Sequence, residues 1–276
     1  GTMAYHKRKV NVFDLTKAIE IWADETYGTC ATKEMRGLIK EGVKLKRHID
    51  WSALTTNDFT ETKDFHDVRE SVDQPGNIKA NIIFEAQFQN NTQDQQSHLM
   101  KTRKTTRSSV TTAINQTYTK GKEMDIKLST PYKILEANAG FHREIFLSKS
   151  QGEVIEEELT WEVESRIEVR ANHCADARLI VEEKKYAGLF EITSELSGNI
   201  TVTFCKAKDD TFVATISADI GTVVAKYLEI NNDTDFKGFV KYSGSTAVIT
   251  TDISAVFEVG IRQKVVVDQN EIGSPK

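Results

Sequence analysis

The chain has 276 residues, of which 39% are hydrophobic and 28% are charged, a composition typical of a globular protein with a core. No run of 18 residues is free of charged side chains, which excludes a transmembrane helix. The net charge of -5 disfavours a nucleic-acid partner and purely electrostatic binding to anionic lipid, because both need a basic surface.

The first residues, Gly1 and Thr2 before Met3, read as a cloning scar. If Met3 is the natural start, the basic residues after it are not followed by an apolar segment, and no conventional secretory signal peptide is visible. If the sequence has been trimmed, it carries no information about such a signal.

Two helices are predicted near the N-terminus. Asp14 is of a type that caps helix N-termini, and Gly28 can end the helix that follows. Apolar residues recur between them at helical spacing: Leu15, Ala18, Ile19, Trp22 and Ala23. A shorter helix is predicted from Thr32, with an inward face of Met35, Leu38, Ile39 and Val43.

Residues 44–77 show no clear period and end in Gln74-Pro75-Gly76-Asn77, a strong turn signal. We place a boundary there, between an N-terminal head, residues 1–77, and a second region, residues 78–276.

Beyond this boundary apolar and polar residues alternate, which is typical of half-buried strands. The clearest sets lie at residues 78–88, 159–169, 212–220 and 255–261. Several exceed the usual strand length, and the chain has 3 prolines. The predicted fold is therefore mainly β, with a small α-containing N-terminal region and an elongated architecture of long antiparallel strands.

Residues 97–119 are rich in Ser and Thr and poor in large apolar side chains. One interpretation is a disordered linker. The other is a strand that is polar on both faces, which the lack of Pro and Gly favours.

Residues 120–149 read as a hairpin with one apolar and one polar face. Two arms of about 10 residues flank a turn at Pro131 and Tyr132, and this is about the length of a transmembrane β-strand. Ile126 and Ile145 are the predicted cross-strand pair. Arg143 on the apolar face and Phe146 on the polar face interrupt the pattern. A soluble hairpin with one face on a core has the same alternation.

The succession of features resembles the aerolysin-like β-pore-forming toxins, in particular the epsilon-toxin and mosquitocidal-toxin branch. A strand ends at Asn90-Asn91-Thr92, the Ser/Thr-rich segment follows, and the amphipathic hairpin stands in the place of the family's insertion loop. Residues 159–204 look like the return strand and the strand after it. The resemblance covers about residues 78–265. It departs from the family at Arg170-Ala171, where such toxins often have Pro, and residues 1–77 match no lectin module.

The resemblance implies a soluble, secreted or released monomer that acts at a target-cell membrane through an unknown surface receptor. It implies assembly into a homo-oligomeric ring and insertion of one hairpin per protomer. Residues 1–77 would then be a receptor-binding head, and residues 78–276 the pore-forming module with its hairpin at 120–149.

Alternation and resemblance together assign roles within this hairpin. The expected membrane-facing residues are Met124, Ile126, Leu128, Ala137, Ala139, Phe141, Ile145 and Leu147. The expected pore-lining residues are Glu123, Asp125, Lys127, Asn138, His142 and Glu144, and the expected tip is Pro131 and Tyr132.

The alternatives to a pore former are a non-lytic β-protein and an enzyme. A non-lytic β-protein that acts as a binding or structural module has the same patterns, and the lack of a visible signal peptide favours it. An enzyme has little support, because no nucleophile elbow, P-loop or catalytic carboxylate pair is recognisable. Cys30, Cys174 and Cys205 are widely spaced and the 6 histidines are scattered, so no catalytic residue, metal ion or cofactor is predicted.

Overall fold

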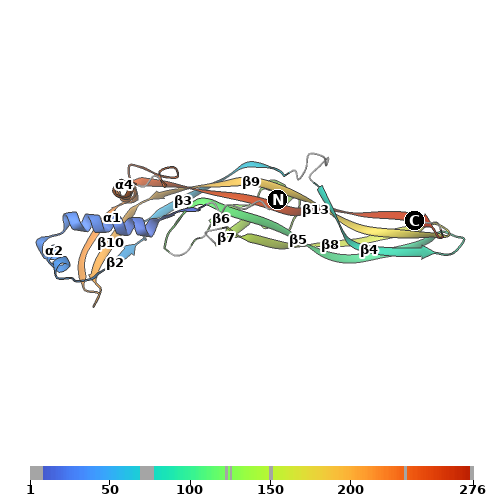
Figure 1. Ribbon diagram of the computed structural model, residues 1–276, viewed down its shortest axis with the longest axis horizontal. Coiled ribbons are helices and arrows are strands. Elements are labelled where there is room, and N and C mark those ends of the chain that lie inside the picture. Colours follow the sequence, from blue (N-terminus) through green and yellow to red (C-terminus); the bar gives the residue numbers. More distant parts are fainter. Residues whose placement is uncertain are drawn as a thin grey trace.

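The computed structural model describes residues 9–68, 78–121, 124, 126–148, 152–232 and 235–273. The molecule is elongated, with its longest strands along the long axis and helices α1, α2 and α4 gathered at one end, which we call the head (Figure 1). The opposite end, which we call the tail, contains strands alone in Figure 1. Within the described residues, no helix has the length and apolar character needed to cross a bilayer.

Within the described residues the strands form three sheets. The main sheet has eight strands: β1 (Asn11–Asp14), β3 (Thr55–Asp67), β4 (Ile78–Asn90), β5 (Gln96–Thr119), β8 (Val154–Val169), β9 (His173–Ser197), β12 (Val240–Ser243) and β13 (Thr246–Glu271). A second sheet contains β2 (Leu45–Asp50), β10 (Asn199–Lys206) and β11 (Phe212–Asp219), and the third contains β6 (Ile126–Ser129) and β7 (Glu144–Leu147). Among the strands that the structure describes, all pairings are antiparallel except the one between β1 and β5.

The Ser/Thr-rich segment is a strand and not a linker. β5 runs unbroken from Gln96 to Thr119, and it pairs in turn with β8, β13 and β1. β5 has few apolar side chains to bury, but hydrogen bonds with its neighbouring strands satisfy its backbone N–H and C=O groups along its length. The four alternating sets at residues 78–88, 159–169, 212–220 and 255–261 also lie in strands, apart from Ile220.

Both predicted N-terminal helices are present. α1 (Leu15–Cys30) begins at Asp14, whose side chain accepts a hydrogen bond from the backbone N–H of Lys17. α2 (Lys33–Lys40) begins in the same way at Thr32, which accepts from the N–H of Met35. The second helix packs less than predicted, since Ile39 is exposed.

A further helix, α4 (Ile220–Asn231), was not predicted. It follows β11 without a loop, and its cap Asp219 accepts from the N–H of Thr222. The alternation of β11 therefore runs into the first helical residue, Ile220. Its buried residues recur at helical spacing: Ile220, Val223, Val224, Tyr227 and Leu228.

The head is not built from residues 1–77 alone. β2 pairs with β10, and β3 pairs with β9 of the main sheet, so strands on both sides of residue 77 are interleaved. The head core joins α1, β10 and α4, and Phe13 contacts the ring of Tyr227 edge-on at 5.5 Å. The sequence boundary at residue 77 separates segments of the chain but not two packed units. The predicted turn at residues 74–77 lies outside the described residues.

In the tail, β5 and β8 form a two-stranded ribbon that faces β4, β9 and β13. A core cluster fills the space between the two layers, with Met100 and Ile167 from the ribbon and Ala175 and Ala177 from β9. Where β13 leaves β5, its register against β9 shifts between Gly260 and Arg262. A Cβ at Gly260 would lie 2.7 Å from Cζ2 of Trp161, so only glycine lets β13 pass this ring.

Candidate functional site

The candidate insertion segment is a small hairpin closed by a helical turn. β6 and β7 are four residues each, with Leu128 opposite Ile145 and Ser129 opposite Glu144. The predicted arms of about 10 residues are therefore wrong for this state of the molecule. Between them lies α3 (Tyr132–Glu136), where the alternation predicted a strand.

The helical turn has an identifiable cause. Pro131 has the φ of -57° that its ring imposes, and its carbonyl accepts from the N–H of Ile134 at 2.9 Å. The turn carries Ile134 into the core, where it is fully buried, although strand alternation places it on the polar face. Pro131 itself is buried, and of the two predicted tip residues only Tyr132 is exposed, at 76%.

The two faces of the hairpin are separated as the alternation predicts. Ile126, Leu128, Ala139, Ile145 and Leu147 are buried, and Met124, Ala137 and Phe141 are half-buried. They pack in one cluster with Phe190 of β9 and with Ile253 and Phe257 of β13. The ring of Phe141 meets that of Phe257 edge-on at 5.7 Å.

The polar face points to water. Lys127, Asn138, His142 and Glu144 are exposed, whereas Glu123 and Asp125 lie outside the described residues. The ammonium of Lys127 forms an ion pair of 2.8 Å with the carboxylate of Glu144 across the two strands. Phe146 is exposed on this face at 63%, as its position predicts. The membrane-facing and pore-lining roles of these residues remain predictions.

Arg143 does not follow the apolar face that alternation assigned to it. It lies in the irregular loop before β7, where its carbonyl accepts from the N–H of Thr130 at 2.8 Å, and its side chain is exposed. The hydroxyl of Thr130 also donates to the carbonyl of His142 at 2.5 Å. These two bonds close the loop and fix the register of the hairpin.

The hairpin joins the body through a few polar contacts at its base. The N–H of Gly121 donates to Oγ1 of Thr16 in α1 at 2.8 Å, and the ammonium of Lys120 lies 4.8 Å from the ring centre of Trp51. On the return side, the carbonyl of Glu153 accepts from both the N–H and the hydroxyl of Thr112. The N–H of Ser148 donates to the carboxylate of Glu153 at 2.7 Å. The anchors at Thr16, Trp51 and Thr112 were not predicted, because no sequence pattern links residues so far apart.

Gly152 is the tightest point of this base. Its φ is +91°, and a Cβ there would lie 2.2 Å from the carbonyl oxygen of Thr112. Both observations require glycine, because side chains strain a left-handed backbone and the β5 backbone leaves no room.

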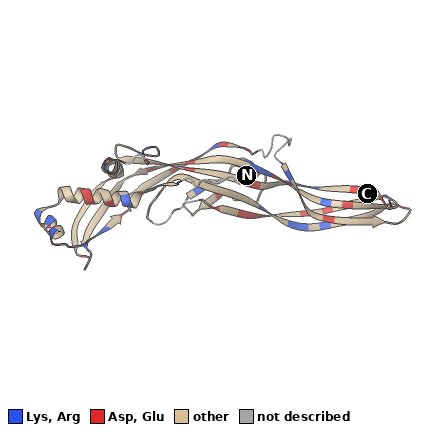
Figure 2. Cartoon of the chain, viewed as in Figure 1, with Lys and Arg blue, Asp and Glu red and all other residues tan. Residues whose placement is uncertain are grey.

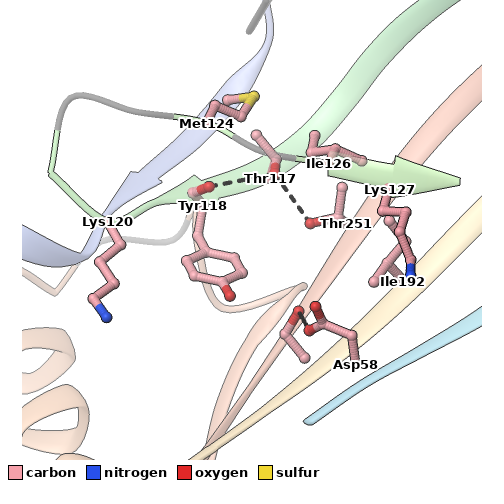
Figure 3. Close-up of a pocket in the computed structure, with 10 residues that line it drawn as sticks. Asp58, Thr117, Tyr118, Lys120, Met124, Ile126, Lys127, Ile192 and Thr251 are labelled. Carbon is pink, nitrogen blue, oxygen red and sulfur yellow. Dashed lines mark hydrogen bonds between the residues drawn. The ribbon is translucent and has the colours of Figure 1, made fainter. Parts of the chain in front are cut away.

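A cavity of about 250 Å³ lies under the start of the hairpin. Met124 and Ile126 lie on one side and Asp58 on the other, with the ring of Tyr118 projecting between them (Figure 3). Burial raises the pKa of the Tyr118 hydroxyl. Ile126 lies opposite Leu147, so the cavity is at the base end of the hairpin and not at the end formed by Leu128 and Ile145.

Within the described ranges, no group of three or more His, Cys, Asp or Glu residues is arranged to hold a metal ion.

Comparison with known proteins identifies relatives by structure. Neither the models of protein families nor the curated protein sequences contain a match to this chain. The Cry23Aa1 and Cry37Aa1 binary protein complex contains a similar structure, with a TM-score of 0.56, 14% identity, and coverage of 95% of this chain and 91% of that one. A non-toxic crystal protein from Bacillus thuringiensis gives a TM-score of 0.56 and 11% identity, over 95% of this chain and 98% of that one. The β-pore-forming protein Mpp75Aa1.1 from Brevibacillus laterosporus gives a TM-score of 0.47 and 10% identity, over 94% and 90% of the two chains.

Identities this low are informative about the fold alone. The predicted mainly β architecture of long antiparallel strands is confirmed, and the chain has an aerolysin-like fold. The assignment to the epsilon-toxin and mosquitocidal-toxin branch stays a prediction.

Proposed function

We propose that the protein is a β-barrel pore former. It is released as a soluble monomer, binds a target-cell membrane through a surface receptor, assembles into a ring and inserts one hairpin per protomer. The hairpin of residues 120–149 supplies the membrane-crossing segment, with its apolar set turned to lipid and its polar set turned to the lumen.

One observation carries the proposal. β6 and β7 pair with each other and, among the described residues, with no strand of the main sheet. The hairpin is held on the body by side-chain packing and by a few contacts at its base. It can therefore detach without the loss of any ladder hydrogen bond from the main sheet, and its amphipathic character is already present in the closed state.

Insertion requires the hairpin to lengthen. Four residues span about 13 Å, whereas a tilted transmembrane strand needs about 9–11 residues. The five residues of α3 and the loop after it would supply the missing length. A helix this short is marginal on its own, so its conversion to strand costs little once its contacts with the body are lost.

Assembly must accompany insertion. A lone hairpin would expose unpaired backbone N–H and C=O groups to hydrocarbon, and each of these costs several kcal/mol. In a closed ring of hairpins every edge is paired, as in other transmembrane β-barrels. The head, where α1 holds the base of the hairpin through Thr16, would be the receptor-binding end.

Dye release from liposomes and lysis of erythrocytes test the proposal, together with negative-stain images of protein mixed with membranes. A pore former gives leakage and rings. Membrane binding without leakage or rings would overturn the proposal and favour a second candidate, a non-lytic binding or structural protein. That candidate has a specific basis, because a protein with a similar fold is described as a non-toxic crystal protein.

A further inference from the structure

The tail ribbon carries one basic strand beside one acidic strand. On the face turned away from the core, β5 presents Lys101, Arg103 and Arg107, and between Gln96 and Thr111 it has no acidic residue. On the same face, β8 presents Glu156, Glu158, Glu162, Glu164 and Glu168, with Arg166 as its only cation. We call these sets the basic stripe and the acidic stripe. Figure 2 shows blue and red side by side along this ribbon.

Within one molecule the stripes form a ladder of ion pairs. Lys101 lies 3.0 Å from Glu164, Arg103 lies 3.2 Å from Glu162, and Arg107 lies 3.1 Å from Glu156. All six side chains are more than half exposed. Three glutamates of the acidic stripe, Glu156, Glu162 and Glu164, therefore each have a cation on the β5 side and still expose more than half of the side chain.

The outer edges of both strands lack a strand partner in the part of the chain described. β8 pairs with β5 alone, and β5 pairs with β8 alone from Gln96 to Ser108. Two side chains of β13 cover the free edge of β8: Nε2 of Gln263 donates to the carbonyl of Glu162 at 2.9 Å, and Nε2 of Gln269 donates to that of Glu168 at 2.7 Å. Side chains are replaceable partners, so these carbonyls remain available to another strand.

We propose that the β8 edge of one copy pairs with the β5 edge of the next, so that the acidic stripe of each molecule meets the basic stripe of its neighbour. The occupant of this edge is thus a second copy of the same chain. This inference rests on the proposed function and names the surface through which the ring assembles.

Strand direction and charge both suit this contact. β5 and β8 of one copy are antiparallel, so in copies related by rotation about a ring axis the β8 of one is also antiparallel to the β5 of the next. The strand order then alternates basic and acidic around the assembly, and each stripe is flanked by the opposite charge on both sides. The contact is heterologous, because two different edges meet, and such contacts close into rings or continue as filaments.

A mixing experiment distinguishes the proposed pairing of β8 with β5 between two copies from the ion pairs between β5 and β8 within one copy. The variant E162K/E164K makes both strands basic, and the variant K101E/R103E makes both strands acidic. Each alone should fail to form oligomers on phosphatidylcholine–cholesterol vesicles or erythrocyte ghosts, measured by chemical cross-linking and negative-stain imaging. An equimolar mixture should recover oligomers, because the basic β8 of the first variant meets the acidic β5 of the second.

Folding is controlled in two ways. The fourfold swap K101E/R103E/E162K/E164K restores opposite charges everywhere and should assemble alone like the wild type. Glu229→Lys reverses one charge of the exposed ion pair between Lys226 and Glu229 on α4, and this variant should assemble normally. At about 1 M salt the Debye length falls to about 3 Å, so each charge-reversed variant should regain part of its assembly.

The outcomes are distinct. If the fourfold swap assembles but the mixture does not, the ladder acts only within one molecule and the inference is overturned. Assembly of either charge-reversed variant at the wild-type level in low salt would overturn it as well. Absence of oligomers for the wild type itself would instead contradict the proposed function.

Discussion

Ile126 lies opposite Leu147 across the β6–β7 hairpin, and both side chains are buried against the body. The alternation alone predicts Ile145 as the partner of Ile126, and this is wrong. The loop bonds from Thr130 to Arg143 and His142 set the register two residues further along. This register defines a disulfide within the hairpin, between positions 126 and 147. A second disulfide, between hairpin and body, is defined by the approach of Gly140 to β8.

The tether between hairpin and body uses Gly140 and Glu157. A Cβ at Gly140 would lie 3.4 Å from Cβ of Glu157 on β8, close to the Cβ separation of about 3.5–4.5 Å in disulfides. The φ of +85° and the carbonyl oxygen of Glu158 at 3.1 Å add strain there, so Gly140→Cys alone is a required control. We expect the oxidised variant Gly140→Cys/Glu157→Cys to lose dye release and to regain it after reduction, because the bond holds the loop on the body. Undiminished leakage from protein whose disulfide has been verified would contradict a moving hairpin.

The staple within the hairpin is the matched control. In Ile126→Cys/Leu147→Cys both cysteines move together, so leakage should be the same in oxidised and reduced protein. Glu157→Cys alone controls for the loss of the glutamate, and it should leak in both redox states.

Phe141→Arg tests the lipid-facing surface. An arginine on the lipid side of a β-barrel costs about 2–4 kcal/mol near the bilayer midplane, and a ring repeats this cost in every protomer. We expect leakage to be lost. Phe141 is a better position than Ile126, because it is only half-buried in the closed state and the folded body tolerates its replacement more easily.

Two controls isolate the membrane effect of this substitution. Phe141→Ala removes the same contact with Phe257 but adds no charge, so it should leak at least as well as the wild type. His142→Arg adds the same charge on the exposed face and should retain leakage. Equal leakage by Phe141→Arg and His142→Arg would show that the two faces have been assigned wrongly.

Gly152→Ala should weaken the docking of the hairpin. The positive φ and the 2.2 Å approach to the carbonyl of Thr112 both oppose a side chain, and the backbone strain alone costs roughly 1–2 kcal/mol. We expect faster proteolysis within the hairpin and leakage at lower protein concentration. Gly42→Ala introduces a similar strain at φ +73° in the head, with no atom within 4 Å, and should change neither measurement.

The parts of the fold that could be predicted from sequence are those whose signal is local. Alternation located β4, β8, β11 and β13, and the side chains of Asp14 and Thr32 marked the starts of α1 and α2. The separation of the hairpin into a buried and an exposed face also followed from alternation, because any sheet face that lies on a core selects apolar residues.

The parts that were missed depend on contacts between distant segments. α3 forms because Pro131 starts a turn that buries Ile134, and this is favourable only when the body lies beneath it. α4 was missed because its first residue continues the alternation of β11. The pairing of β2 with β10 joins residues about 150 positions apart, and alternation within either strand carries no information about its partner.

Glu182 links the stability of the fold to pH. It is 5% exposed on β9 and accepts hydrogen bonds from Lys264, at 2.7 Å, and from Arg262. These two cations hold the pKa of the Glu182 carboxyl below its ordinary value. A carboxyl with a lowered folded-state pKa stabilises the fold above its ordinary pKa, and this contribution is lost as the pH falls through the lowered value.

Glu182→Gln should therefore lower Tm at pH 7, and the difference from wild type should shrink as the pH falls below the ordinary carboxyl range. Thermal unfolding followed by circular dichroism between pH 7 and pH 3 measures this. Glu229→Gln, at an exposed helical pair, is the control and should change Tm little. A constant difference across the whole range would mean that packing, and not the charge of Glu182, is responsible.

The last prediction concerns the ion preference of the pore. By alternation the lumen receives the acidic residues Glu123, Asp125 and Glu144 and the cation Lys127, and Glu136 takes a further polar position near the tip of the hairpin. In the closed hairpin Lys127 and Glu144 are already paired at 2.8 Å. If this register persists in the barrel, the pair cancels, and the uncompensated charge of each protomer comes from Glu123, Asp125 and Glu136.

Rings of acidic side chains favour cations, although screening at 0.15 M salt limits the field to a Debye length of about 8 Å. We therefore expect a modest cation preference that strengthens at low salt, measured as single-channel reversal potentials in a KCl gradient. Lys127→Gln frees Glu144 and should increase the preference, whereas Glu144→Gln frees Lys127 and should decrease it. An anion-selective wild-type pore would mean that the inward and outward faces are exchanged.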